Sequence, residues 1–140
     1  MDTKFDFFND HSEQYLEMAF CADYLEILHN PDGRGKNTGD CGDTVEVFLC
    51  AAGERISDIS FHIDGCINTR ACANTMARMI EGKTMTETWR ITPQDVIQYL
   101  QTLPAESHHC AELVCGALYR ALADLRRNVR DPWKKNYIFK

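Results

Sequence analysis

Several features are missing from this sequence of 140 residues, and each absence excludes a class of protein. It has no run of 18 apolar residues, so we expect no membrane-spanning helix and no membrane partner. The first residues, Met1 to Asp6, lack a basic stretch followed by an apolar one, which does not support a secretory signal. There is no internal repeat and no low-complexity segment. We therefore expect one cytoplasmic domain over residues 1–140, with a core of about residues 12–127 and short tails at both ends.

Positive charge is also scarce. The chain has 15 Lys and Arg against 21 Asp and Glu, a formal net charge of -6. Binding to phosphate backbones depends on clustered Lys and Arg, so no nucleic-acid partner is expected. The one basic cluster, residues 120–135, is interpreted as a solvated helix end followed by a tail.

Cysteine, in contrast, is abundant. The chain has seven cysteines, an odd number, and no export signal, which favours metal or catalytic use over a disulfide framework. Three of them lie in distinctive settings: Asp40-Cys41-Gly42-Asp43, Asp64-Gly65-Cys66 and His108-His109-Cys110. Thiolates bind zinc and iron-sulfur clusters, and imidazole or carboxylate groups complete such sites. The candidate metal ligands are therefore Cys41, Asp43, Cys66, His109 and Cys110.

The other four cysteines have no such setting. We interpret them as small buried side chains that fill the core, which is the commonest use of a free cysteine. These residues are Cys21, Cys50, Cys72 and Cys115.

Periodicity and capping signals predict the secondary structure. The first half of the chain is expected to form a helix over residues 12–28, a polar loop over 33–42 and a hairpin of strands 44–50 and 59–63. A helix over residues 67–81 follows and stops at Gly82. Two short helices then begin after Thr84 and Thr92, the second reaching Leu100, and the last helix covers residues 111–127. A small antiparallel sheet packed on one face by several helices is the expected α+β fold. Cys66 and Cys110 would then lie at helix N-termini, where the helix dipole lowers the pKa of a thiol.

The three motifs also resemble a known family. Cys-Gly-Asp is followed after 25 residues by Gly-Cys and after another 44 by His-Cys, an order and spacing similar to those of the IscU-type scaffold, which also forms the N-terminal domain of NifU. The resemblance runs from about Asn30 to Arg127. It implies a SufE/IscU-like fold and a non-enzymatic carrier. Such a carrier accepts iron and persulfide sulfur from a cysteine desulfurase, and passes a 2Fe-2S cluster to apo iron-sulfur proteins.

The resemblance also implies roles for the candidate ligands. Cys41, Cys66 and Cys110 would bind iron, and either Asp43 or His109 would complete the coordination shell. A hard carboxylate is a weaker partner than thiolate for a soft cluster, so Asp43 would favour release. Cys110, beside two histidines, is our candidate for the first persulfide acceptor. Zinc would fit the same site, and a monomer or weak dimer is expected.

The sequence departs from the family pattern in three places. The stretch around residues 30–33 is shortened, which predicts two good strands and a ragged third. Residues 103–107 read Leu-Pro-Ala-Glu-Ser where the family carries Leu-Pro-Pro-Val-Lys, the docking sequence for a dedicated Hsp70-type chaperone, so we do not expect that chaperone as a partner. Residues 67–70 read Ile-Asn-Thr-Arg where many members carry small residues.

Two other functions compete with the scaffold interpretation. A zinc-dependent sulfur-transfer partner of a cysteine desulfurase, like SufU, would use the same cysteines. That group lacks the His before the last Cys and carries an insertion ahead of it, whereas this chain has His109 and ordinary spacing. A purely structural zinc domain is the third possibility, because three Cys with Asp or His make a closed tetrahedral set.

Overall fold

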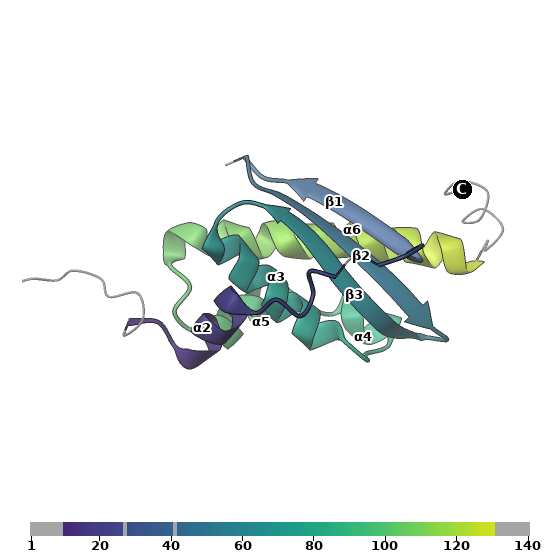
Figure 1. Cartoon of the computed structure of the whole chain (residues 1–140), viewed down its shortest axis with the longest axis horizontal. Helices are drawn as coiled ribbons and strands as arrows, with labels where there is room; N and C mark the ends of the chain where they lie inside the picture. Colours follow the sequence, from purple (N-terminus) through teal and green to yellow (C-terminus); the bar gives the residue numbers. More distant parts are fainter. Residues whose placement is uncertain (1–9, 27, 41, 131–140) are drawn as a thin grey trace, which may run out of the picture.

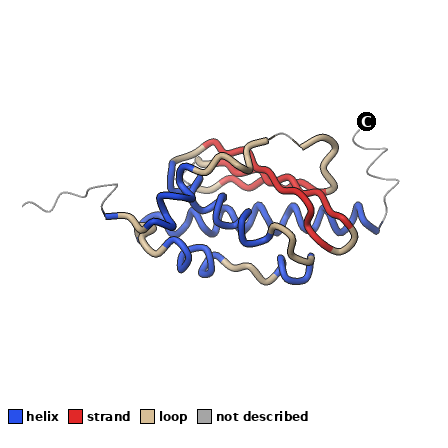
Figure 2. Tube along the Cα trace, turned by 60° about the horizontal axis from the view of Figure 1, so that its bottom comes forward, coloured by secondary structure: helices blue, strands red, loops and turns tan. Residues whose placement is uncertain are grey.

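The computed structural model describes residues 10–26, 28–40 and 42–130. One sheet forms one layer and the helices form a second layer on one face of it (Figures 1 and 2). The elements are α2 (Glu13–Phe20), β1 (Gly33–Thr38), β2 (Thr44–Ala52), β3 (Arg55–Asp64), α3 (Ile67–Ile80), α4 (Met85–Trp89), α5 (Pro93–Leu100), the short 3₁₀ helix η1 (Ala105–Ser107) and α6 (His108–Arg130). The predicted α+β class is confirmed.

The sheet has three antiparallel strands in the order β1-β2-β3. The predicted hairpin of β2 and β3 is confirmed, and the chain turns through Gly53, whose φ of 63° suits glycine. Val45, Val47 and Leu49 alternate toward the helices and are fully buried. The sheet therefore presents one apolar face to the helical layer.

The prediction of a loop over residues 33–42 is wrong, because residues 33–38 form β1. This strand has no apolar alternation to reveal it, since its inward positions are Gly33 and Gly35. A Cβ atom on Gly35 would lie 2.3 Å from the backbone nitrogen of Ala121 in α6. The glycines thus allow the backbone of α6 to lie directly against the strand.

Side chains of α6 also reach the backbone of β1. Arg120 donates to the carbonyl of Lys36 at 2.7 Å, and the carboxylate of Asp124 accepts from the Arg34 N–H at 3.0 Å. Asn37 donates from its side chain to the carbonyl of Leu113 at 3.1 Å. Helix and strand are therefore joined along their length.

The ends of the middle helices follow the predicted signals. Thr84 with Glu87 and Thr92 with Asp95 each form a capping box, and α5 begins with a proline and ends at Leu100. Helix α3 ends at Ile80, and Gly82 follows with a φ of 78°. These predictions are confirmed. Each capping signal involves residues within one helical turn, so it can be recognised from the sequence alone.

The first helix is shorter than predicted. Helix α2 ends at Phe20 rather than at Leu28, and Cys21 already has an extended backbone. The carbonyl of Tyr24 accepts a hydrogen bond from the Phe61 N–H of β3 at 3.0 Å, and the side chain of Tyr24 is buried. Pairing with a distant strand therefore overrides the local helical spacing. The last helix, α6, begins at His108 rather than Ala111 and extends to Arg130.

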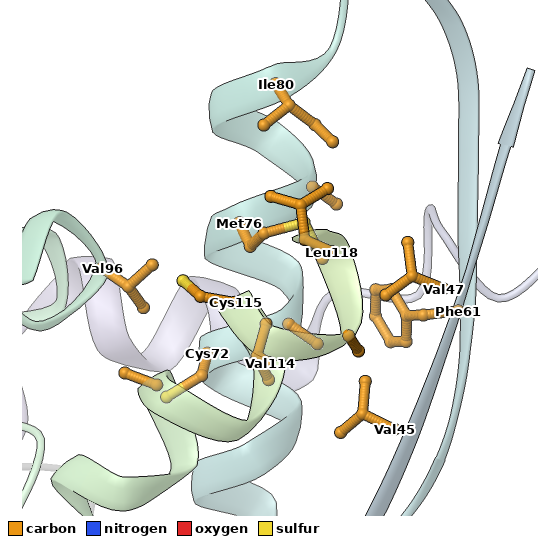
Figure 3. Close-up of a cluster of buried hydrophobic side chains, with 14 of the residues drawn as sticks. Val45, Val47, Phe61, Cys72, Met76, Ile80, Val96, Val114, Cys115 and Leu118 are labelled. Atoms are coloured by element: carbon orange, nitrogen blue, oxygen red, sulfur yellow. The ribbon is translucent and has the colours of Figure 1, made fainter. Parts of the chain in front are cut away.

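The core lies between the sheet and the helices α3 and α6, and it continues between these two helices and α5. Figure 3 shows valines 45 and 47 and Phe61 of the sheet facing Met76 of α3 and Leu118 of α6. Cys72 and Cys115 are fully buried in this core, as predicted, whereas Cys21 and Cys50 are half-buried. In the part of the chain that is described, no helix is both long and apolar enough to cross a bilayer.

We expect the substitution Gly35→Ala to destabilise the fold, because the added methyl group would overlap the backbone of α6. Overpacking of this kind costs about 1–3 kcal/mol. Urea unfolding measures the loss, with Lys36→Ala as the control, since that exposed side chain belongs to the same strand. A free energy of unfolding equal to that of the control would show that the close contact is not required.

Candidate metal centre

The ends of three elements meet at one end of the sheet, where β2 begins and β3 ends. Asp43 lies immediately before β2, Cys66 is the N-cap residue of α3 and follows β3, and Cys110 lies in the first turn of α6. One carboxylate oxygen of Asp43 and the two Sγ atoms all lie within 4.8 Å of one another. Among the described residues, these three therefore form a group able to hold a metal ion.

Gly65 explains how Asp43 and Cys66 come so close. Thr44 pairs with Asp64 across β2 and β3, so the residues that flank this pair are neighbours. A Cβ atom on Gly65 would lie 2.7 Å from Oδ2 of Asp43, where any side chain would displace the carboxylate. The absence of a side chain at Gly65 is thus a requirement of the site.

Thr69 is a residue of this site that sequence reasoning missed. Its hydroxyl donates to Oδ2 of Asp43 at 2.9 Å, lies 3.3 Å from Sγ of Cys110 and 3.6 Å from Sγ of Cys66. The side chain is fully buried. A hydroxyl has one proton and two lone pairs, so Thr69 can donate to Asp43 or to the thiolate of Cys110, but only to one of them at a time. The available signal was its spacing, because the third residue of a helix lies beside the N-cap residue.

The two cysteines differ in their access to solvent. Cys66 is exposed, whereas Cys110 is 1% exposed. Burial raises the pKa of Cys110 to about 11, an effect that the hydrogen bond from Thr69 opposes and the neighbouring Cys66 reinforces. The expectation that the N-terminus of the helix lowers the pKa of Cys110 is therefore wrong, because removal from water outweighs the helix dipole.

His109 lies beside this group rather than within it. Its Nδ1 is 3.0 Å from the carbonyl of Glu106, which can only accept, so Nδ1 carries the proton. In that tautomer of the neutral ring, Nε2 is an acceptor, and it lies 3.8 Å from Sγ of Cys110. His108 turns its Nε2 toward the carbonyl of Leu103 at 3.3 Å instead. Cys41, the remaining predicted ligand, lies outside the described residues.

The donor set suits a thiophilic metal. Two thiolates bound to one zinc ion at about 2.3 Å in tetrahedral geometry lie about 3.8 Å apart. The three donor atoms, within 4.8 Å of one another, need to close by no more than about 1 Å to reach that spacing. The site would still need a fourth donor, and His109, whose Nε2 is 3.8 Å from Sγ of Cys110, is a described candidate.

An open recess borders the site. Residues 37–40 line one wall, and His109, Glu112 and Leu113 of α6 line the other, with a cavity volume of about 450 Å³. His109 thus lies between the recess and Cys110. Asp43, Cys66 and Cys110 themselves do not line the recess, so it adjoins the site through His109.

Comparison with known proteins points to one family. The model of the NifU-like N terminal domain matches residues 28–131. The chain is 36% identical over 87 residues to iron-sulfur cluster assembly scaffold protein IscU 1 of Archaeoglobus fulgidus, an alignment that covers 62% of this chain and 57% of that protein. It is 30% identical over 126 residues to nitrogen fixation protein NifU of Trichormus azollae, which covers 84% of this chain and 42% of that protein. The chain thus spans about half the length of these curated relatives.

Solved structures share the fold. One is a putative iron-sulfur cluster assembly scaffold protein for the SUF system from Fervidobacterium islandicum, with a TM-score of 0.68 and 21% identity over 79% of this chain and 95% of that one. Another is the N-terminal part of a NifU-like protein from Brucella abortus, with a TM-score of 0.69 and 19% identity over 83% of this chain and 94% of that one. The arrangement of sheet and helices described above is therefore shared with these proteins.

We expect Thr69→Val to disturb the site and Thr69→Ser to preserve it, because valine has nearly the same shape but no hydroxyl. Loss of the hydrogen bond to Asp43 should lower the free energy of unfolding of the metal-free protein by about 1 kcal/mol. Loss of this support for a metal ligand should weaken zinc binding at least about tenfold. Competition with a chromogenic chelator measures the affinity. Equal affinities for the two variants would show that the hydroxyl has no role.

We also expect the thiols to react in order of exposure. In metal-free protein at pH 7.5, iodoacetamide should modify Cys66 before Cys110, which is buried and protonated. Peptide mass spectrometry after timed quenching measures the two rates, and the same reaction in denaturant provides the fully exposed reference. Equal rates in the folded protein would contradict the burial of Cys110.

Proposed function

Because this chain belongs to the NifU-like N-terminal domain family, we propose that it is a scaffold on which iron-sulfur clusters are assembled and from which they are transferred to apo-proteins. One observation carries the proposal: Asp43, Cys66 and Cys110, which come from three separate sequence motifs, place their ligand atoms within 4.8 Å of one another. The protein would then be a carrier whose cluster is cargo, and would not be an enzyme.

The proposed ligands of the cluster are Cys41, Asp43, Cys66 and Cys110, with His109 as an alternative to Asp43. Two irons joined by two sulfides need four terminal ligands, and thiolates are the usual ones. Asp43 supports the proposal because it already lies among the thiols, whereas His109 lies beside Cys110 only. A carboxylate in place of a fourth thiolate gives a cluster that is bound less tightly, which suits transfer.

The proposed sulfur donor is the persulfide of a cysteine desulfurase. The sulfur of Cys110 attacks the outer sulfur of that persulfide, the S–S bond breaks, and the partner's cysteine leaves as a thiolate. The proton of Cys110 passes to Nε2 of His109, 3.8 Å away, and from there to the leaving thiolate. Cys110 gains one sulfur atom, the partner loses one, and no electrons are needed from outside.

The burial of Cys110 sets a condition on this step. At 1% exposure its sulfur cannot meet a partner's persulfide in the arrangement described. Acceptance at Cys110 therefore requires the start of α6 to move when the partner docks, for which the recess beside His109 is the proposed entry. Cys66, which is exposed, is the alternative acceptor.

A second function, zinc-dependent sulfur transfer of the SufU type, has an observation in its favour. One carboxylate and two thiols close together match the ligand set of a single zinc ion. The fold is also shared with a scaffold protein of a SUF system. Under this proposal zinc would remain bound and one cysteine would accept the sulfur.

Anaerobic reconstitution with iron, cysteine and a cysteine desulfurase tests both functions. We expect visible absorption bands of a 2Fe-2S cluster, which then moves to an added apo-ferredoxin. Faster desulfurase turnover that requires zinc, with no cluster formed, would replace the scaffold by the sulfur-transfer partner. The first result supports the scaffold, and the second supports the sulfur-transfer partner.

Substitutions should separate binding from release. We expect Cys66→Ala to abolish the cluster, because one of its thiolates is lost, whereas Cys21→Ala, at a half-buried cysteine with no proposed ligand role, should leave it intact. Asp43→Cys should retain the cluster and slow its transfer to apo-ferredoxin, since thiolate binds the cluster more tightly than carboxylate. An undiminished cluster in Cys66→Ala would refute the assigned ligands.

A further inference from the structure

Helix α2 precedes the region matched by the family model and is anchored at both of its ends. Ser12, its N-cap residue, donates from its hydroxyl to the carbonyl of Leu100 at 2.6 Å. At the other end, the side-chain amide of Asn74 in α3 donates to the carbonyls of Met18 and Cys21 at 2.6 and 3.1 Å. The helix therefore lies in a defined position against α3 and α5.

From this position α2 reaches the vicinity of the cysteines. Tyr15 is fully buried, its ring stacks on that of His11 at 3.6 Å, and its hydroxyl donates to Oδ1 of Asn68. Burial, with the nearby cysteines, raises the pKa of Tyr15 to about 12, so the hydroxyl keeps its proton at neutral pH. Asn68 lies in the first turn of α3, two residues after Cys66.

The same amide continues to the other cysteine segment. The Nδ2 of Asn68 donates to the hydroxyl of Ser107 at 3.0 Å, and Ser107 ends η1 three residues before Cys110. Asn68 thus uses its acceptor toward α2 and its donor toward the start of α6. One side chain connects three segments that are far apart in the sequence.

We propose that Tyr15, Asn68 and Ser107 form a positioning bridge that holds the segments of Cys66 and Cys110 at the spacing a metal requires. None of the three is a ligand. Their effect is indirect: a site whose ligands are already placed loses less freedom on binding, and therefore binds more tightly. Helix α2 thereby becomes part of the site's support. The inference rests on the proposed ligand roles of Cys66 and Cys110, but not on any step of cluster transfer.

The test measures binding of Zn²⁺ and Co²⁺ by the full chain, with no desulfurase present. We expect Asn68→Ala to weaken Zn²⁺ binding about tenfold, as loss of a group that supports a ligand does. Tyr15→Phe and Ser107→Ala should each give a smaller loss. In the Asn68→Ala background neither should have a further effect, because both act through the same amide.

Two control variants separate the bridge from general stability. Tyr24→Phe also removes a buried tyrosine hydroxyl, one that donates to Glu81 rather than to the site, and should leave metal affinity unchanged. Asn74→Ala removes the hydrogen bonds at the C-terminal end of α2 but leaves the anchor at Ser12, near Tyr15, so it should lower the midpoint of urea unfolding without weakening Zn²⁺ binding. The absorption bands of bound Co²⁺ should shift in Asn68→Ala and stay unchanged in both controls, since they report on ligand geometry.

The inference would be overturned if Asn68→Ala bound Zn²⁺ as tightly as wild type. It would also be overturned if Asn74→Ala lost as much Zn²⁺ affinity as Asn68→Ala. These results are independent of the proposed function. If wild-type protein binds Zn²⁺ and the bridge variants weaken it, but no cluster forms with a desulfurase, the scaffold proposal fails and the bridge stands. If clusters form and transfer while every bridge variant binds Zn²⁺ like wild type, the bridge fails alone.

Discussion

The direct contact between the backbone of α6 and the two glycines of β1 fixes the position of the candidate site. With no side chain at Gly33 and Gly35, the helix lies against the strand, and Asn37 holds the carbonyl of Leu113 at the far end of that contact. The first turn of α6, which carries Cys110, is thereby placed beside the start of β2, which Asp43 precedes. A feature of the core thus determines how the candidate metal ligands are placed.

Within the site, neighbouring residues differ in burial and therefore in their need for hydrogen-bond partners. Thr69 and Cys110 are buried, where each polar atom needs a partner, while Cys66 is exposed and Asp43 half-buried. The hydroxyl of Thr69 is such a partner for Asp43 and for Cys110. The candidate centre is therefore hydrogen-bonded on its buried side, at Thr69 and Cys110, and exposed to solvent at Cys66.

Local signals in the sequence predicted much of this structure. The alternation of Val45, Val47 and Leu49 revealed β2, and Thr92 with Asp95 marked the start of α5. The identity and order of the cysteine motifs predicted a set of candidate ligands, and the structure brings three of them, Asp43, Cys66 and Cys110, close together.

The errors arose where distant parts of the chain decide. Strand β1 is explained by its contact with α6, and the early end of α2 by the pairing of Tyr24 with Phe61. The pKa of Cys110 depends on burial, and the contacts of Thr69 and Asn68 join segments that lie dozens of residues apart in the sequence.

The side chains of Arg120 and Asp124 in α6 also protect the edge strand β1. They occupy backbone groups of Lys36 and Arg34 that point away from β2, at the outer edge of the sheet. An edge strand with free backbone groups can pair with another chain, and α6 removes two of the groups that such pairing would use.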